Sequence, residues 1–73
     1  MWFGNKSRAL EIEVALLEVV SEKGFVHSEL ITLYSQGKDV NEVFEILGGP
    51  MNYIRTQYIS LYKLSLENGI PLP

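Results

Sequence analysis

Apolar side chains recur at intervals of three and four positions along most of the chain, with polar side chains between them. This is the period of an α-helix, whereas a half-buried strand alternates at every second residue. Short segments that contain glycine separate stretches of this kind. The pattern predicts helices over about residues 6–23, 29–36, 40–47 and 51–68. The sequence therefore predicts an all-α fold, in which residues 1–73 form a single small four-helix domain.

Glycine follows each predicted helix and marks its end, because glycine adopts the left-handed backbone of a helix C-terminus at little cost. The glycines that first follow the four helices are Gly24, Gly37, Gly48 and Gly69. Asp39 followed by Glu42 is a capping-box arrangement, so we expect the third helix to begin there. Ser28 suits the N-cap of the second helix, and Pro50 suits the first turn of the fourth.

The predicted first helix has an apolar arc that is wider than one contact face needs. The arc consists of Ala9, Leu10, Ile12, Leu16, Leu17, Val19 and Val20. Such an arc suits a helix that packs on two sides, once within the chain and once across a dimer interface. Apolar residues make up 47% of the 73 residues, which is generous for a domain that buries only about 60% of its unfolded surface. We therefore expect a homodimer with a shared core.

The N-terminal part of the chain also offers candidate contacts to a different protein. Trp2 and Phe3 precede the predicted first helix, and such large aromatics cover either the chain's own core and dimer interface or a partner. Glu13 falls inside the apolar arc beside Leu17, where an unpaired carboxylate would be costly. It either binds an arginine or lysine of a partner or reaches solvent or a tyrosine hydroxyl at a dimer edge. We expect the second, because long side chains commonly extend to solvent.

The predicted fourth helix carries apolar side chains around much of its circumference. Helical spacing groups Met51, Ile54, Tyr58, Leu61, Tyr62 and Ser65 on one face. The same spacing sets Tyr53 and Leu64 apart from that face, and it places Ile59 and Leu66 at its margin. The polar side consists of Asn52, Thr56, Ser60, Lys63 and Glu67. Residues 70–73 contain two prolines and are predicted to form an extended tail.

The segment from Leu33 to Lys63 resembles a helix-turn-helix of the bacterial regulator type. Residues 39–48, DVNEVFEILG, open with a capping residue, continue with apolar positions three and four apart and end in Leu-Gly, as the first helix of such motifs does. The preceding LYSQGK is similar to the common lead-in to these motifs. The resemblance covers residues 30–63, and it implies that Ile54 and Tyr58 hold a recognition helix against its neighbours.

The resemblance to the helix-turn-helix DNA-binding superfamily implies a small DNA-binding protein that acts in transcription regulation. Its fourth helix would enter the major groove of duplex DNA, and a dimer would present two such helices about 34 Å apart. The groove-facing residues would be Met51, Asn52, Arg55 and Thr56, with Lys63 available to a phosphate. Asparagine can pair with adenine, arginine with guanine, and threonine can contact a thymine methyl group.

The distribution of charge leaves a second class of function open. The formal net charge is −3, and residues 1–45 carry four basic and eight acidic side chains. Residues 46–73 carry Arg55 and Lys63 against Glu67, so only this part could face a phosphate backbone. The alternative function is a small acidic helical adaptor or inhibitor that docks on a basic surface of another protein.

The sequence offers no pattern for catalysis, and we do not expect an enzyme. The chain has one histidine, one aspartate and no cysteine, and no phosphate-binding glycine loop follows a strand. We expect His27 to lie in a surface turn, and we expect no metal and no cofactor. No run of about 18 apolar residues predicts a membrane span, and the N-terminus lacks the apolar region of a signal peptide. The absence of cysteine suits a reducing compartment, so we expect a cytoplasmic protein.

Overall fold

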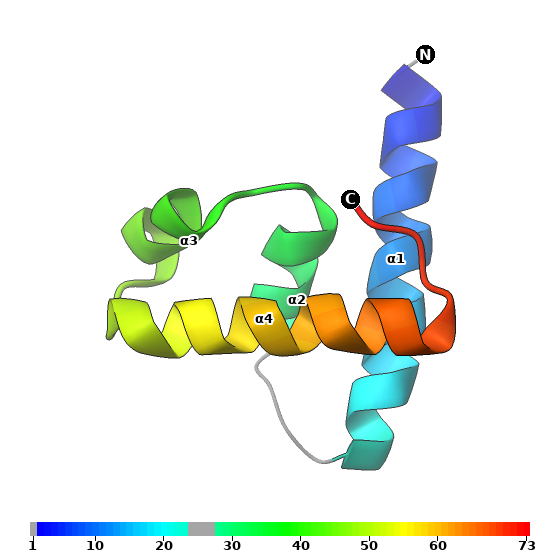
Figure 1. Ribbon diagram of the computed structural model, residues 1–73. Helices are drawn as coiled ribbons and strands as arrows, with labels where there is room; N and C mark the ends of the chain where they lie inside the picture. Colours follow the sequence, from blue (N-terminus) through cyan, green and yellow to red (C-terminus); the bar gives the residue numbers. More distant parts are fainter. Residues whose placement is uncertain (1, 24–27) are drawn as a thin grey trace.

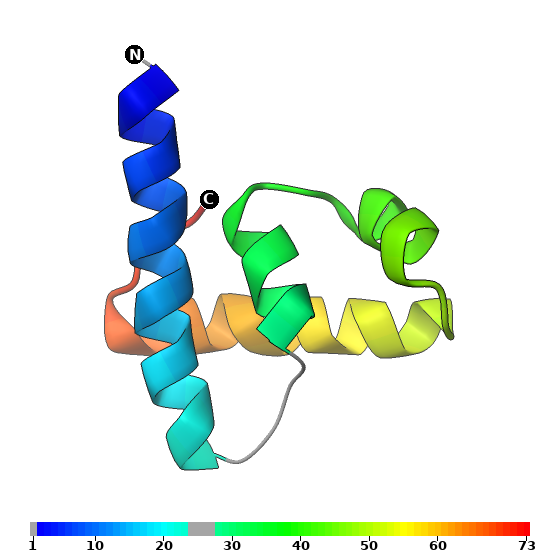
Figure 2. The same cartoon turned by 180° about the vertical axis from the view of Figure 1, so that it is seen from behind.

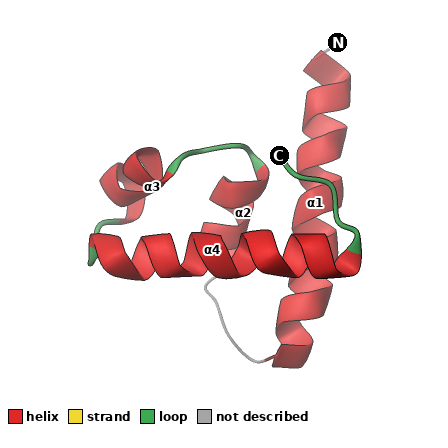
Figure 3. Cartoon of the chain, viewed as in Figure 1, coloured by secondary structure: helices red, strands yellow, loops and turns green. Residues whose placement is uncertain are grey.

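The chain is all-helical in the computed structural model, which describes the backbone of residues 2–23 and 28–73 and the side chains of residues 8–21 and 28–73 (Figure 1, Figure 3). The helices are α1 (Trp2–Lys23), α2 (Ser28–Ser35), α3 (Val40–Leu47) and α4 (Met51–Asn68). The predicted all-α fold with four helices is confirmed. The expectations for Gly24 and His27 fall outside the described residues.

Two helix starts differ from those that the sequence predicts. α1 begins at Trp2 rather than near residue 6, so Trp2 and Phe3 belong to the helix instead of preceding it. No proline interrupts this segment, and an existing helix extends at little cost per added residue. α2 begins at Ser28, which is therefore the first residue of the helix and not its N-cap.

The long helix α4 lies across one side of the molecule and contacts both α1 and α3. α1 packs against α2 and crosses the C-terminal part of α4, whereas α3 lies beside the N-terminal part of α4 (Figure 1). Seen from behind, α1 and α2 stand in front of α4 (Figure 2). One long side of α4 therefore has no described helix over it.

The hydrophobic core lies where α1, α2 and α4 meet. Its buried members are Ile12, Leu16, Val20, Leu30, Ile31, Tyr34, Leu61, Leu64 and Ile70. Burying one side chain of this size stabilises the fold by about 1.5–3 kcal/mol. Val43 and Ile54 are also buried, but they lie outside this cluster. Val43 is the only described residue of α3 that is fully buried, so α3 is a peripheral helix.

The C-terminal tail folds back onto the body of the protein. Gly69 adopts the left-handed conformation, and the N–H of Ile70 donates to the carbonyl of Ser65 at 2.9 Å. This turn places Ile70 in the core with 8% of its surface exposed. Beyond it, the guanidinium of Arg8 in α1 donates to the carbonyl of Leu72 through Nη2 at 2.7 Å and through Nε at 3.3 Å. The predicted extended tail is therefore packed along α1 (Figure 1).

The short connection between α2 and α3 is capped at both ends, as the sequence predicts. Gly37 has a φ of +86°, and the N–H of Lys38 donates to the carbonyl of Leu33 at 3.1 Å, which closes the end of α2. Asp39 accepts from the N–H of Glu42 at 2.9 Å, and the Glu42 carboxylate accepts from the N–H of Asp39 at 3.0 Å. This reciprocal pair is the capping box. The connection therefore fixes where α3 starts.

Candidate functional site

The corner between α3 and α4 is built from two glycines and a proline. Gly48 and Gly49 have φ values of +73° and +85°, and the N–H of Gly48 closes α3 on the carbonyl of Phe44 at 2.8 Å. Pro50 is the N-cap of α4 and has an extended backbone. It therefore lies just before the first turn of the helix, whereas the sequence predicts it within that turn. Its carbonyl accepts from the N–H of Tyr53 at 3.1 Å. The corner redirects the chain into α4 within three residues.

The polar residues predicted to contact DNA lie on the uncovered side of α4. Asn52, Arg55, Thr56 and Lys63 are all exposed, and helical spacing places them on the side opposite the buried Ile54 and Leu61. In Figure 1 this helix passes in front of α1 and α2, and α3 lies above its N-terminal part. The four side chains are therefore accessible to a large ligand. The fifth predicted contact, Met51, is half-buried at the start of the helix.

Tyr58 sets the rotation of α4 about its own axis. Its hydroxyl donates to the backbone carbonyl of Lys38, and its ring meets the ring of Tyr34 edge to face with 5.2 Å between the centroids. Burial raises the pKa of Tyr58 to about 12, and the negative charges of Asp39 and Glu42 add to this shift, as does Tyr34. These contacts turn the opposite side of α4 toward solvent.

The charge on the outer side of α4 is weakly positive. Arg55 and Lys63 lie there, no acidic residue occupies the first turn, and Glu67 is the only carboxylate of the helix. The site can therefore offer two cations and two short polar side chains. That set suits hydrogen bonds to base edges and a small number of phosphate contacts.

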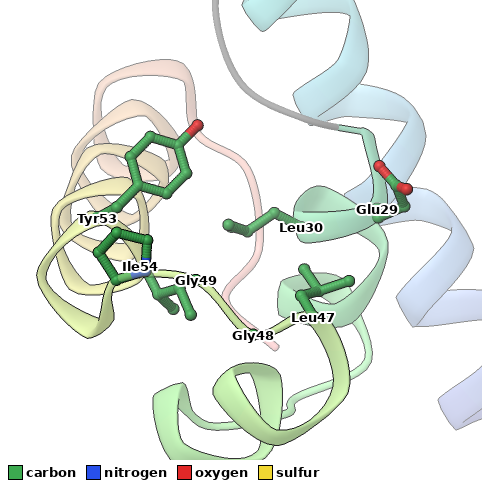
Figure 4. A pocket seen from close by; sticks show the side chains of 8 residues that line it. Glu29, Leu30, Leu47, Gly48, Gly49, Tyr53 and Ile54 are labelled. Carbon is green, nitrogen blue, oxygen red and sulfur yellow. The ribbon is translucent and has the colours of Figure 1, made fainter.

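A cleft of about 310 Å³ opens beside the corner, between the start of α2, the end of α3 and the start of α4 (Figure 4). Leu30, Leu47, Tyr53 and Ile54 supply most of its apolar lining, and Glu29 lies at its rim. Its volume lies at the lower limit of small-molecule pockets. Leu47 and Tyr53 are both about 40% exposed, so the cleft also adds apolar surface around the corner.

Two rows of exposed apolar side chains were only partly visible in the sequence. The α1 stripe consists of Leu10, Val14 and Leu17, which are 37–61% exposed. The α4 stripe consists of Ile59, Tyr62 and Leu66, which are 49–58% exposed. Each row has the spacing of one helix face. Tyr62, which the spacing groups with Ile54 and Leu61, is 49% exposed, whereas Leu64, which the spacing sets apart, is 7% exposed and belongs to the core.

The N-terminal candidates for protein binding do not form one surface. Leu17 lies in the α1 stripe, whereas the Glu13 carboxylate is turned inward and accepts a hydrogen bond from the Thr32 hydroxyl of α2 at 2.9 Å. Glu13 is half-buried and bonds a threonine, where we expected a contact with solvent or with a tyrosine hydroxyl. Trp2 and Phe3 begin α1, and their side chains lie outside the described set.

Comparison of the chain with models of protein families, with curated proteins and with solved structures found no match. Within residues 2–23 and 28–73, no helix is sufficiently long and apolar to span a membrane. The described side chains contain no group of three or more histidine, cysteine or carboxylate residues that could hold a metal ion. The candidate site therefore rests on the geometry of α4 and its supporting helices.

Proposed function

We propose that this protein binds duplex DNA through the first half of the outer side of α4. The observation that carries the proposal is the shared exposure of Asn52, Arg55 and Thr56 on a helix that α3 supports across a glycine corner. A helix that stands free of its neighbours along one side can enter a major groove. Ile54 and Tyr58, on the opposite side, keep that helix anchored to the rest of the protein.

Each exposed side chain has a distinct role in this proposal. Arg55 reads guanine, Asn52 reads adenine and Thr56 contacts a thymine methyl, each worth about 1–3 kcal/mol of discrimination. Lys63 lies further along the helix and neutralises a phosphate. Because few cations are present, binding is weak for one copy and stronger when two copies present two α4 helices to one site.

Selection from a pool of random duplexes at low salt tests this proposal. The wild-type protein should enrich a short sequence, and Arg55→Ala should relax the preference at one position. Lys63→Ala should instead weaken binding to all sequences. It should also reduce the slope of log affinity against log salt concentration by about one, because one phosphate contact is lost. Lys38→Ala is the matched loss of a cation in the α2–α3 connection, which contacts α4 through Tyr58 and not through the outer side of the helix, and it should leave binding unchanged. If no sequence is enriched at low salt, the proposal is wrong.

A second function, docking on another protein, is favoured by the apolar surface that the fold leaves exposed. Ten large hydrophobic residues of the described set have more than a third of their surface exposed: the three of the α1 stripe, the three of the α4 stripe, Phe44, Ile46 and Leu47 of α3, and Tyr53 of α4. Exposed apolar patches mark interaction sites. Cross-linking in a lysate followed by mass spectrometry tests this function. If the wild-type protein captures one partner and Val14→Asp does not, the result would support an adaptor rather than a DNA-binding protein.

A further inference from the structure

The α1 stripe and the α4 stripe match in length. In each stripe the first and last side chains are seven positions apart, which corresponds to about 10 Å along a helix. In both, the middle residue falls on the same helix face as its neighbours, so each stripe forms a continuous ridge. Two ridges of equal length can pack side by side along their whole extent.

The α1 stripe has a negative edge. Leu10 and Val14 line a shallow depression of about 490 Å³ together with Glu11, Ala15 and Glu18. Both of these glutamates are exposed. The third carboxylate nearby, Glu13, is engaged by Thr32 on the inward side. Among the described side chains, the negative charge available to a partner at this stripe therefore comes from Glu11 and Glu18.

The α4 stripe has a weakly positive edge, because Arg55 and Lys63 outnumber the single carboxylate of the helix, Glu67. Arg55 lies one helical turn before Ile59, and Lys63 directly follows Tyr62 in the sequence. Both cations are exposed on the outer side of α4. An apolar ridge flanked by lysine and arginine fits an apolar ridge flanked by carboxylates, because opposite charges then meet around an apolar contact.

Charge decides which pairing of the stripes is favourable. Pairing α1 with α1 of another copy brings carboxylates together, and pairing α4 with α4 brings cations together, which is unfavourable in both cases. Pairing α1 with α4 brings carboxylates to cations. We infer that a second copy of this chain docks its α4 stripe on the α1 stripe, with Glu11 and Glu18 facing Arg55 and Lys63 of the second copy.

This contact joins different surfaces of the two copies. α4 lies on one side of the molecule and α1 stands on the other, so a copy cannot cover its own α1 stripe with its own α4 stripe (Figure 1, Figure 2). The interface is therefore head-to-tail, and each joined pair keeps one free stripe of each kind. Association continues beyond two copies unless a ring closes.

Sedimentation of the purified protein without nucleic acid tests the inference. The wild-type protein should gain mass with concentration, and less so at high salt, because salt screens the charged edges. Glu18→Lys and Lys63→Glu should each weaken association by about tenfold, since each replaces an attraction with a repulsion. An equimolar mixture of the two variants should regain the wild-type association constant, because each reversed edge then meets its complement.

Two further variants test whether the effect is specific to the two stripes. Glu45→Lys makes the same change of charge on α3, away from both stripes, and should associate as the wild type does. Val14→Asp should abolish association while circular dichroism shows an unchanged helix content, because Val14 is 48% exposed and outside the core. The inference would be overturned if the mixture associated no more strongly than each variant alone, or if Lys63→Glu left association unchanged. It would also be overturned if the wild-type protein stayed monomeric at all concentrations. The contact engages Arg55 and Lys63, which the DNA-binding proposal also uses, so a docked α4 is not free to bind DNA at the same time. Because DNA is absent from these measurements, their outcomes test the contact between copies alone.

Discussion

The hydroxyl of Tyr58 in α4 donates a hydrogen bond to the backbone carbonyl of Lys38, in the connection between α2 and α3. The two residues are 20 positions apart in the sequence. The bond ties α4 to the connection that precedes α3, and the edge-to-face contact with Tyr34 holds the ring in place. Together they determine which side of α4 faces solvent, and therefore where Asn52 and Arg55 point.

Tyr58→Phe should lower the free energy of unfolding by about 1 kcal/mol. The substitution keeps the ring and its packing but removes the donor to the Lys38 carbonyl, and a hydrogen bond of this kind contributes about 0.5–1.5 kcal/mol. Urea denaturation followed by circular dichroism measures the change. Tyr62→Phe removes a hydroxyl from a residue that is 49% exposed, and it should change stability by less than about 0.5 kcal/mol. Equal effects of the two substitutions would show that the bond to Lys38 does not stabilise the fold.

Stability should decline at alkaline pH because of the same residue. The pKa of Tyr58 is about 12 in the folded protein, against 10 for an ordinary tyrosine. The neutral phenol therefore favours the folded state fully below pH 10, and this contribution is lost as the pH rises through about 12. Denaturation curves over this range should show a steeper decline for the wild-type protein than for Tyr58→Phe. Parallel curves would contradict the raised pKa.

Asp39→Asn should lower the pKa of Tyr58 without removing the N-cap of α3. Asparagine caps a helix about as well as aspartate, but it carries no charge. The charge of Asp39 is the second cause of the raised pKa after burial, so the pKa should fall below about 12 and stay above 10. An ultraviolet titration of the phenolates, compared with that of Tyr58→Phe to assign the group, measures it. Glu45→Gln, which removes a charge that does not act on Tyr58, should leave the titration unchanged.

Local patterns in the sequence were sufficient to predict the helices and most of their ends. Glycine at 37, 48 and 69 and the Asp39–Glu42 pair act within a few residues, so their effect can be read without knowledge of the fold. The rotation of α4 could not be predicted in this way. Apolar residues surround much of that helix, and the choice between Tyr62 and Leu64 as the buried one depends on distant contacts such as the bond from Tyr58.

The candidate site was predictable to the extent that it depends on helix geometry. The exposure of Asn52, Arg55 and Thr56 follows from their shared spacing on one side of α4. The α4 stripe was missed because helical spacing places Tyr62 on the same face as the buried Ile54 and Leu61, with Ile59 and Leu66 at the margin of that face. The carboxylate of Glu13 found Thr32, which is 19 positions away, and no local pattern indicates such a partner.

The two glycines that end α3 and α4 should differ in their tolerance of a side chain. A Cβ atom at Gly48 or Gly69 would meet no other atom within 4 Å, so the cost of substitution comes from the backbone alone. Gly48 has φ +73° and ψ −160°, a region that is essentially restricted to glycine, whereas Gly69 has the ordinary left-handed values of +65° and 28°. Gly48→Ala should therefore cost about 2–3 kcal/mol and Gly69→Ala about 1–2 kcal/mol.

Thermal and urea denaturation of the two glycine variants measure this difference. Gly69→Asn serves as the control, because asparagine tolerates the left-handed region and should cost less than alanine there. Gly48→Asn should destabilise the protein about as much as Gly48→Ala, since asparagine is not favoured at the ψ of Gly48. If Gly48→Ala is as stable as the wild-type protein, the corner before α4 is not the conformation described.

Gln57 should be replaceable by methionine with a gain in stability. Its Oε1 atom is buried and, within the described part of the chain, has no hydrogen-bond partner. An unpaired buried polar atom costs about 1–3 kcal/mol, and methionine has a similar unbranched shape without the polar atom. Gln57→Met should raise the free energy of unfolding by about 1 kcal/mol. Gln36→Met, at an exposed glutamine, should change it by less than about 0.5 kcal/mol. A loss of stability on Gln57→Met would mean that the amide oxygen is paired in solution, with water or with a residue outside the described set.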